Sequence, residues 1–419
     1  MKNTSISIIA LLGCIAVMSV CTGKSKSSES LTISVENNDK VPIYVNMEGI
    51  LKKEGTEQLS TTATEITYIP LELTDNSTLR GISFFVHLNG KLIVSDSHSI
   101  ILFDKDGKYI KDVSQSGQGP SDFVQLISHI IVDNEESNLY LFSSHNKVIQ
   151  FNKNADYIRN FQINNGTNWS ITKGTFTPQN TMILAYHNVP KRHSDTTTVY
   201  NAIEVDTIGN ILNKFENYSP RYIEENGIRY LNSIPFLDVF NNNIRFMDFS
   251  NDTIFTIIDN AMIPYAILDL GEDKTTFTLD YYLSENFNQS KLNEAYDKLK
   301  GHAIMDVQEN DNYLFFKLTK KGLRGDGIYS IYNKQTKDLK LLKNEGLLND
   351  LDGGPDFFPR KCIGDIMVGW KKPTEFKEEV LSKDYNEQKA KYGERFEKVY
   401  QLAKSLQEDD NPILMVVKK

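Results

Sequence analysis

Arginine and tyrosine side chains gather in one segment that has the composition of a loop. Arg221, Tyr222, Arg229 and Tyr230 lie within ten residues. Tyrosine combines an apolar ring with a polar hydroxyl, and a guanidinium group donates paired hydrogen bonds to carboxylates. The segment therefore predicts contacts to a saccharide or a peptide, with a solvated loop as the alternative. Single candidates for ligand binding stand in other connections: Gln118, Arg324, Asp326, Asp356, Arg360 and Trp370.

The sequence lacks the usual motifs for catalysis and metal binding. The seven histidines show no His-x-x-x-His spacing, and no Gly-x-Ser-x-Gly motif occurs. Asp104-Lys-Asp-Gly107 begins like a calcium loop but lacks the later acidic ligands. Gly117-Gln-Gly-Pro120 is glycine-rich, but no helix follows it to complete a phosphate site. We predict no catalytic residue, metal ligand or cofactor, and a divalent metal only if distant carboxylates converge.

A repeated unit of four short strands must position these candidates. In the first unit the turn Asp104–Gly107 separates the last two strands, as in a hairpin. The unit recurs 48 residues later, where Phe103 matches Phe151 and Tyr109 matches Tyr157. Five complete units are expected, and they cover Ile82–Val113, Ile127–Ile163, Ile171–Glu216, Phe236–Leu270 and Ala303–Lys343.

A sixth unit contains only three strands near the C-terminus. Pro359–Ile363, Ile366–Trp370 and Ile413–Val417 need a fourth strand, and the unpaired segment Ile66–Leu73 can supply it. Such closure removes the exposed strand edges of an open array. The prediction is an all-β fold, a six-bladed β-propeller whose last blade is closed by strands from both ends of the chain. Two helical insertions, at about 280–302 and 374–408, are expected on one face.

Long and short connections fall on opposite faces of such a propeller. Connections between strands 1 and 2, or 3 and 4, of each unit are short turns, and together they form the short-turn face. All long connections, including both helical insertions, join strands 2 and 3 or link successive units. They form the long-loop face, which we expect to carry binding because loops vary on a rigid scaffold. The alternative is that the helices only cap the channel.

The first residues have the pattern of a targeting segment. The apolar run Ile6–Val20 has about 15 residues, fewer than the roughly 20 needed to span a membrane. It ends at Cys21, where a polar stretch begins. We predict a lipoprotein signal peptide over 1–21 with lipidation of Cys21, a polar tether over 22–60 and the propeller over 61–419. A secreted protein and an uncleaved anchor are the alternatives.

Charge and cysteine content narrow the possible partners. The formal net charge of −9 argues against a nucleic-acid partner, which requires a clustered basic face. After Cys21 only Cys362 remains, so the mature chain has no pair for an internal disulfide. No histidine stands near Cys362 in the sequence, and its strand-like surroundings predict a buried structural residue rather than a nucleophile.

The chain resembles the six-bladed β-propeller lipoproteins of Gram-negative gut anaerobes, which are related to NHL and TolB-like propellers. The motifs that carry the resemblance are Ile69-Pro-Leu-Glu72, Phe103-Asp-Lys-Asp-Gly-Lys108, Gly117-Gln-Gly-Pro120, Asn251-Asp-Thr-Ile-Phe255, Asp352-Gly-Gly-Pro-Asp-Phe-Phe-Pro359 and Asn411-Pro-Ile-Leu414. They follow one another along nearly the whole mature chain. One departure is Ser121-Asp122-Phe123, where the family tends to have Gly-Glu-Tyr. The resemblance implies the fold and an envelope location more than an activity.

We therefore favour a non-catalytic binding or scaffold protein over an enzyme. It would be a monomer that touches the membrane only through its lipid and engages a glycan, a peptide or an envelope protein. The alternative is a lyase, hydrolase or lactonase with a site at the channel mouth, possibly dependent on a metal. A structural subunit of an envelope assembly is a third reading.

Overall fold

The computed structural model describes residues 41–164, 171–186, 191–192, 198–217, 222–223, 235–248, 251–275, 300–321, 324–343 and 346–419. The predicted signal peptide with Cys21 and most of the first helical insertion lie outside these ranges.

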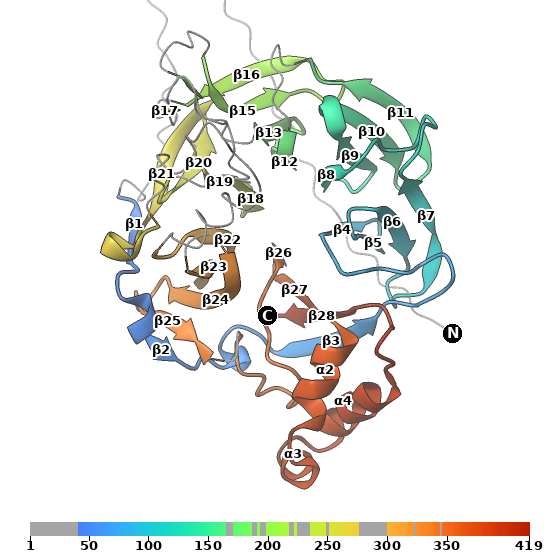
Figure 1. The fold of residues 1–419 in the computed structure, drawn as a ribbon, viewed down its shortest axis with the longest axis vertical. Coiled ribbons are helices and arrows are strands. Elements are labelled where there is room, and N and C mark those ends of the chain that lie inside the picture. Colours follow the sequence, from blue (N-terminus) through green and yellow to red (C-terminus); the bar gives the residue numbers. More distant parts are fainter. Residues whose placement is uncertain are drawn as a thin grey trace, which may run out of the picture. The chain divides into compact units, whose positions relative to one another are not determined.

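Six mainly antiparallel sheets are blades around a central channel, with the first strand of each blade innermost (Figure 1). The predicted six-bladed propeller is thus confirmed. Blade 1 consists of β4 (Phe84–Leu88), β5 (Lys91–Ser95), β6 (Ser99–Phe103) and β7 (Tyr109–Gln115). Blade 2 consists of β8 (Ile127–Val132), β9 (Asn138–Ser143), β10 (Lys147–Asn152) and β11 (Tyr157–Gln162). Blade 3 consists of β12 (Ile171–Phe176), β13 (Met182–Tyr186), β15 (Tyr200–Val205) and β16 (Ile211–Glu216).

Blades 4 to 6 complete the ring and also use strands from the N-terminal part of the chain. Blade 4 consists of β18 (Phe236–Phe240), β19 (Asn243–Met247), β20 (Thr253–Ile258), β21 (Ala261–Asp269) and β1 (Ile43–Asn46). Blade 5 consists of β22 (Ile304–Glu309), β23 (Tyr313–Lys321), β24 (Arg324–Asn333), β25 (Leu339–Leu342) and β2 (Glu54–Gly55). Blade 6 consists of β26 (Lys361–Ile363), β27 (Ile366–Lys371), β28 (Ile413–Lys418) and β3 (Glu65–Pro70).

Residues 41–60 run along the rim of the ring, so the predicted tether over 22–60 needs correction in this part. β1 pairs in parallel with β21, and β2 pairs in parallel with β25. The segment is polar overall, but four sparse apolar side chains anchor it and are fully buried: Val45, Met47, Ile50 and Leu59. Their burial is favourable enough to hold an otherwise polar strand against the blades.

Closure of blade 6 by the two ends of the chain is confirmed. β28 pairs antiparallel with β3, with Leu414 opposite Ile69. Glu72 fixes this segment to blade 1, because its N–H donates to the Gly107 carbonyl (2.8 Å) and its carboxylate accepts from the N–H of Tyr109 (2.9 Å). Gly107 has φ of 85°, and a Cβ there would stand 2.4 Å from the Pro70 carbonyl. Glycine is therefore required at this approach.

Six hydrophobic clusters hold the ring together, and each lies between two neighbouring blades. The cluster between blades 6 and 1, for example, contains Val368 and Leu414 together with Phe85 and Phe103. Every blade thus buries both faces against its neighbours, as a closed array demands.

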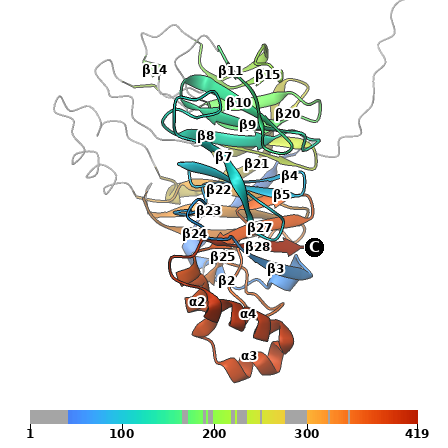
Figure 2. The same cartoon turned by 90° about the vertical axis from the view of Figure 1, so that its right-hand side faces the viewer.

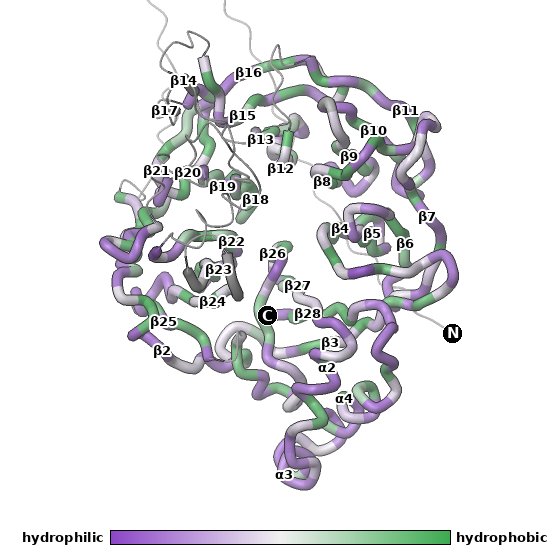
Figure 3. Tube along the Cα trace, viewed as in Figure 1, coloured by the Kyte–Doolittle hydropathy of each residue, from purple (hydrophilic) through white to green (hydrophobic). Residues whose placement is uncertain are grey.

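Three helices in the connection between β27 and β28 form the second predicted insertion. They are α2 (Pro373–Leu381), α3 (Tyr385–Tyr392) and α4 (Glu394–Ser405), and they lie at the rim beside blade 6 (Figures 1 and 2). These helices have an apolar core of their own, because Phe396 and Val399 of α4 pack with Phe376 of α2 and Ile413 of β28. α3 buries no residue and is mostly hydrophilic (Figure 3). Within the described ranges, no helix combines the length and apolarity of a bilayer span.

Candidate functional site

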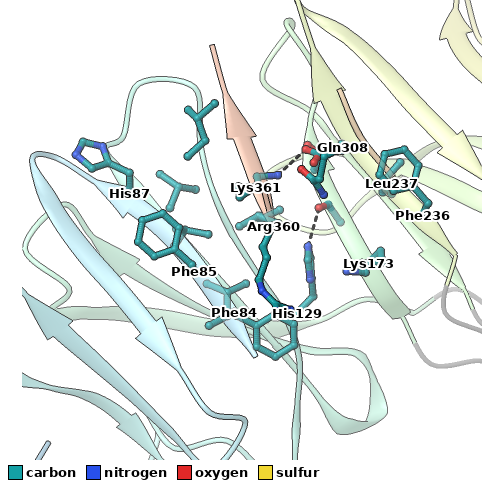
Figure 4. A pocket seen from close by; sticks show the side chains of 18 of the residues that line it. Phe84, Phe85, His87, His129, Lys173, Phe236, Leu237, Gln308, Arg360 and Lys361 are labelled. Carbon is teal, nitrogen blue, oxygen red and sulfur yellow. Dashed lines mark hydrogen bonds and ion pairs between the residues drawn. The ribbon is translucent and has the colours of Figure 1, made fainter. Parts of the chain in front are cut away.

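The first strands of all six blades enclose a cavity of about 630 Å³ in the channel. This volume lies within the range of small-molecule sites. Phe84, Lys173, Asp238, Asp306 and Lys361 line it from five different blades. Figure 4 shows Lys173, Lys361, His129 and Arg360 among the lining side chains. We call His129, Lys173, Asp238, Asp306 and Lys361 the channel cluster.

A shared backbone irregularity sets the direction of three members of the channel cluster. Pairing between the first two strands skips one residue in blades 2, 3 and 5, immediately before His129, Lys173 and Asp306. A bulge of this kind re-aims the side chain that follows it and is frequent beside functional sites. The repeated architecture thus brings a histidine, a lysine and a carboxylate to equivalent positions around one cavity.

Lys361 and Asp238 form an ion pair across the channel. The Lys361 Nζ lies 2.5 Å from Asp238 Oδ1, which joins blade 6 to blade 4. The Lys361 side chain is 33% exposed and that of Asp238 15%. This lysine and this carboxylate therefore largely neutralise each other.

Lys173 and Asp306 are differently placed, because each faces the cavity without a close ionic partner. Among the described residues the Lys173 ammonium has no hydrogen bond or ion pair, and its pKa is lowered by burial, with Asp306 opposing the shift. Burial likewise raises the pKa of Asp306, although Lys173 opposes this. The Asp306 carboxylate accepts a long hydrogen bond of 3.5 Å from Gln308 Nε2 and one from the backbone N–H of Val307, and neither donor carries a charge. An uncompensated charge in such surroundings is unfavourable unless a partner arrives.

His129 is the neutral member of the channel cluster. Burial lowers its pKa well below the ordinary value, and the charges of Lys173 and Lys361 lower it further. Its Nε2 donates to the Gly174 carbonyl at 3.0 Å, and its ring meets Phe84 edge to face at 5.7 Å between centroids. Nδ1 is buried and, within the described part of the chain, has no partner. His129 therefore shapes the wall without adding positive charge.

Arg360 supplies a further cation. Its guanidinium carbon lies 5.3 Å from the centre of the Trp370 ring, and both residues line the cavity. The Arg360 side chain is exposed and forms no ion pair with a described residue. Trp370 thus supports the arginine through one face of its indole, which leaves the guanidinium hydrogens directed to a ligand.

The opposite end of the cavity has a different character. There His87 Nδ1 lies 2.8 Å from Glu136 Oε1, and Glu136 also accepts from the N–H of Asn89 at 2.6 Å. His87 lies near the end of β4 and Asn89 in the short turn that follows it, whereas Glu136 lies in the short turn of blade 2, so the carboxylate is already occupied by the neighbouring blade.

The described residues contain no group of three or more His, Cys, Asp or Glu side chains that could hold a metal ion. Cys362 is buried, as predicted, and burial raises the pKa of its thiol. A thiol held in its protonated form is a poor nucleophile.

The predicted site residues are placed unevenly. Of those whose side chains the structure describes, only Arg360 and Trp370 line the cavity. Gln118 is exposed on the connection between blades 1 and 2. Asp356 is buried in a loop, where its Oδ1 accepts from the N–H of Asn349 at 3.2 Å, so it has a structural role.

The other predicted residues lie where the structure describes little. Arg324 and Asp326 are part of β24, because β23 and β24 continue beyond the blade as a hairpin instead of ending in the predicted loop 319–327. Their side chains are not described. Tyr222 lies in β17 (Tyr222–Ile223), which pairs in parallel with β14 (Lys191–Arg192). Arg221, Arg229, Tyr230 and Cys21 lie outside the described residues.

The channel cluster was not predicted, although a signal for it exists in the sequence. Lys173, Asp238 and Asp306 are each the third residue of a first strand, and Asp238 interrupts the otherwise apolar strand Phe236-Leu-Asp-Val-Phe240. A charge within the innermost strand of a propeller blade faces either the channel or a neighbouring blade. Reading the five full units for that single position would have identified these residues.

Comparison with known proteins supports the fold. A family model described as a domain of unknown function (DUF4934) matches residues 42–418. The chain is similar to an exported protein of Bacteroides fragilis, with a TM-score of 0.64, 16% identity and coverage of 90% of this chain and 100% of the other. A protein of unknown function from Bacteroides caccae gives a TM-score of 0.37 at 11% identity, over 66% and 81% of the two chains. No curated protein matches the sequence.

Proposed function

The chain belongs to the DUF4934 family, and we propose that it is an exported propeller that binds a glycan or peptide ligand in its central channel. One observation carries the proposal. The 630 Å³ cavity is lined by charged side chains from separate blades, and among the described residues Lys173 has no close partner. Structural charges are normally paired, whereas ligand sites keep a few polar groups available. The ligand would enter from the long-loop face, where Arg360 and Trp370 lie.

We propose further that the protein is a monomeric envelope lipoprotein anchored through Cys21, similar to the NHL and TolB-like propeller lipoproteins. The apolar segment before Cys21 and the exported relative support this view. Labelled palmitate should enter the wild-type chain in cells, and Cys21→Ser should abolish both labelling and membrane association. Labelling that persists in the variant would contradict the assignment.

A second candidate function, catalysis in the channel, is favoured by one specific observation. Lys173 has a lowered pKa and Asp306 a raised one, and such opposed shifts are typical of acid–base pairs. A lysine that is partly neutral can remove a proton, and a partly protonated carboxyl can donate one. Product formation that is lost in Lys173→Met would favour this candidate over binding alone.

The test of channel binding is a thermal-shift and calorimetric screen of the purified chain against soluble glycans and peptides. Thr175→Trp places a large side chain in the cavity and should abolish every specific signal. Thr78→Trp makes the same change at an exposed position and should leave binding intact. Binding that survives in a folded Thr175→Trp variant would place the site elsewhere and overturn the proposal.

A further inference from the structure

Resting on channel binding as proposed above, we infer that the ligand is an acidic saccharide of the uronate type, whose carboxylate is held by Lys173. The inference names a ligand class for which the channel has separate features: cations for the carboxylate, acceptors for hydroxyl groups and aromatic rings for the apolar face of a sugar.

The balance of partnered and unpartnered charges selects an anion. Lys361 and Asp238 neutralise each other at 2.5 Å. The other lining charges are the cations Lys173, Lys317 and Arg360 and the carboxylates Asp133, Glu136 and Asp306. Asp133 and Glu136 are held by hydrogen bonds at the short turns. Away from these turns Asp306 is the one carboxylate left beside the cations, and Lys173 and Arg360 form no ion pair with a described residue. The local excess is therefore positive, and an incoming carboxylate would compensate a lysine that burial now penalises.

The other lining groups favour a sugar acid over a simple organic acid. Asp306 and Gln308 offer sp² oxygens close to Lys173, and such acceptors suit the hydroxyl groups of a pyranose. Gln308 is itself fixed, because its Oε1 accepts from the N–H of Cys362 at 3.1 Å. Phe84 and Phe236 add apolar surface to the same cavity. A peptide with a free C-terminal carboxylate would also use the lysine, but it offers single amide N–H donors, whereas a pyranose presents several hydroxyl donors on one rigid ring.

The test uses isothermal titration of the full chain with digalacturonate and diglucuronate, each beside its methyl ester and its neutral disaccharide. We expect at least one free acid to bind, and its ester and neutral counterpart to bind about 10- to 100-fold more weakly, the range for loss of one charge-assisted hydrogen bond. Lys173→Met should cause a similar loss, and Lys173→Arg should restore part of the affinity. Lys105→Met changes an exposed turn lysine outside the cavity and should leave affinity unchanged.

The outcomes separate this inference from the proposed function. Equal affinity for acid and neutral sugars, unaffected by Lys173→Met but lost in Thr175→Trp, would overturn the uronate ligand and retain channel binding. Binding of acetylated dipeptides with a free carboxylate, with no response to any uronate, would likewise overturn it in favour of a peptide. Both the uronate inference and channel binding would be overturned if neither uronate bound and the wider screen gave no ligand whose binding is lost in Thr175→Trp. Retention of the thermal transition in Lys173→Met excludes unfolding as the cause of lost affinity.

Discussion

Two groups of charged side chains in this protein each combine lysine with carboxylates but differ in how they are partnered. Between blades 4 and 5, Glu309 accepts from Arg245 Nε at 3.0 Å, from Lys334 Nζ at 2.6 Å and from the Tyr265 hydroxyl, and Arg245 also stacks 3.5 Å from the centre of the Tyr265 ring. We call these four residues the inter-blade cluster. In the channel cluster, by contrast, Lys173 has no such contact with a described residue.

This difference teaches how to distinguish structural charge from ligand-binding charge in one fold. Burial lowers the pKa of both Lys334 and Lys173, so the pKa shift alone does not separate them. The burial of Lys334 is compensated, because its Nζ donates to Glu309 Oε1 and to the Asn310 carbonyl, both at 2.6 Å. Lys173 has only the more distant charges of Asp306 and Asp238. A buried ion whose hydrogen bonds are satisfied holds blades together, and one without a close partner is the kind of group for which we propose a ligand.

The largest expected effect comes from removing the centre of the inter-blade cluster. Glu309→Gln leaves two buried cations, Arg245 and Lys334, without a counter-ion. We expect the free energy of unfolding to fall by about 3–5 kcal/mol, the range for breaking a buried pair. Chemical denaturation measures it. Asp156→Asn breaks an exposed pair with Lys111 and should cost far less, because solvent screens the pair. Equal losses in the two variants would remove the distinction between buried and exposed charge.

The next prediction applies one substitution to the two buried lysines. Lys334→Met removes two hydrogen bonds and deprives Glu309 of one of its two cationic partners. We therefore expect the free energy of unfolding to fall by about 1–3 kcal/mol. Lys173→Met removes an unpaired ion and should leave the thermal transition unchanged or raise it. Paired melting curves test the contrast directly. A destabilised Lys173→Met with a tolerant Lys334→Met would reverse our assignment of the two clusters.

The ion pair across the channel should show an intermediate behaviour. Lys361→Met frees Asp238 and makes the cavity more negative, so we expect uronate affinity to fall, though less than in Lys173→Met. Because the Lys361 side chain is one-third exposed, the free energy of unfolding should change by about 1 kcal/mol. Titration calorimetry beside denaturation separates the two effects. A loss of stability well above that of the exposed Lys111–Asp156 pair would mark this contact as structural.

The blades were predicted from the sequence, whereas the channel cluster was not, for a physical reason. Strand alternation and Asp-x-x-Gly turns are local, so each of the five complete units is readable in its own segment. Closure was also predictable, because the sixth unit contains three strands and the unpaired segment Ile66–Leu73 supplies the fourth as β3. The channel cluster instead joins single residues from five blades, and the bulges that aim three of them leave no residue type as a signature.

The same limit explains the apolar anchors of the N-terminal segment. Val45, Met47, Ile50 and Leu59 are too sparse to form a pattern, and their partners lie more than two hundred residues further along the chain. Composition therefore indicated a tether where the structure has strands.

The smallest expected effect is a pH dependence that originates in the channel. Burial raises the pKa of Asp306, and the shift is upward even though Lys173 opposes it. A carboxyl with a raised pKa in the folded state favours folding while protonated, and this contribution is lost as the pH rises through that pKa. Asp306→Asn imitates the protonated form. The variant and the wild type should therefore be equally stable below the ordinary aspartate pKa, and the variant should become more stable as the pH rises above it. Denaturation series at several pH values measure the difference.

Asp311→Asn is the matched control. The hydrogen bonds from Lys419 and Asn241 lower the pKa of Asp311, so Asp311→Asn should become less stable than the wild type as the pH rises. If Asp306→Asn also lost stability there, attraction to Lys173 would outweigh burial, and the two would form a structural pair instead of a site awaiting its ligand.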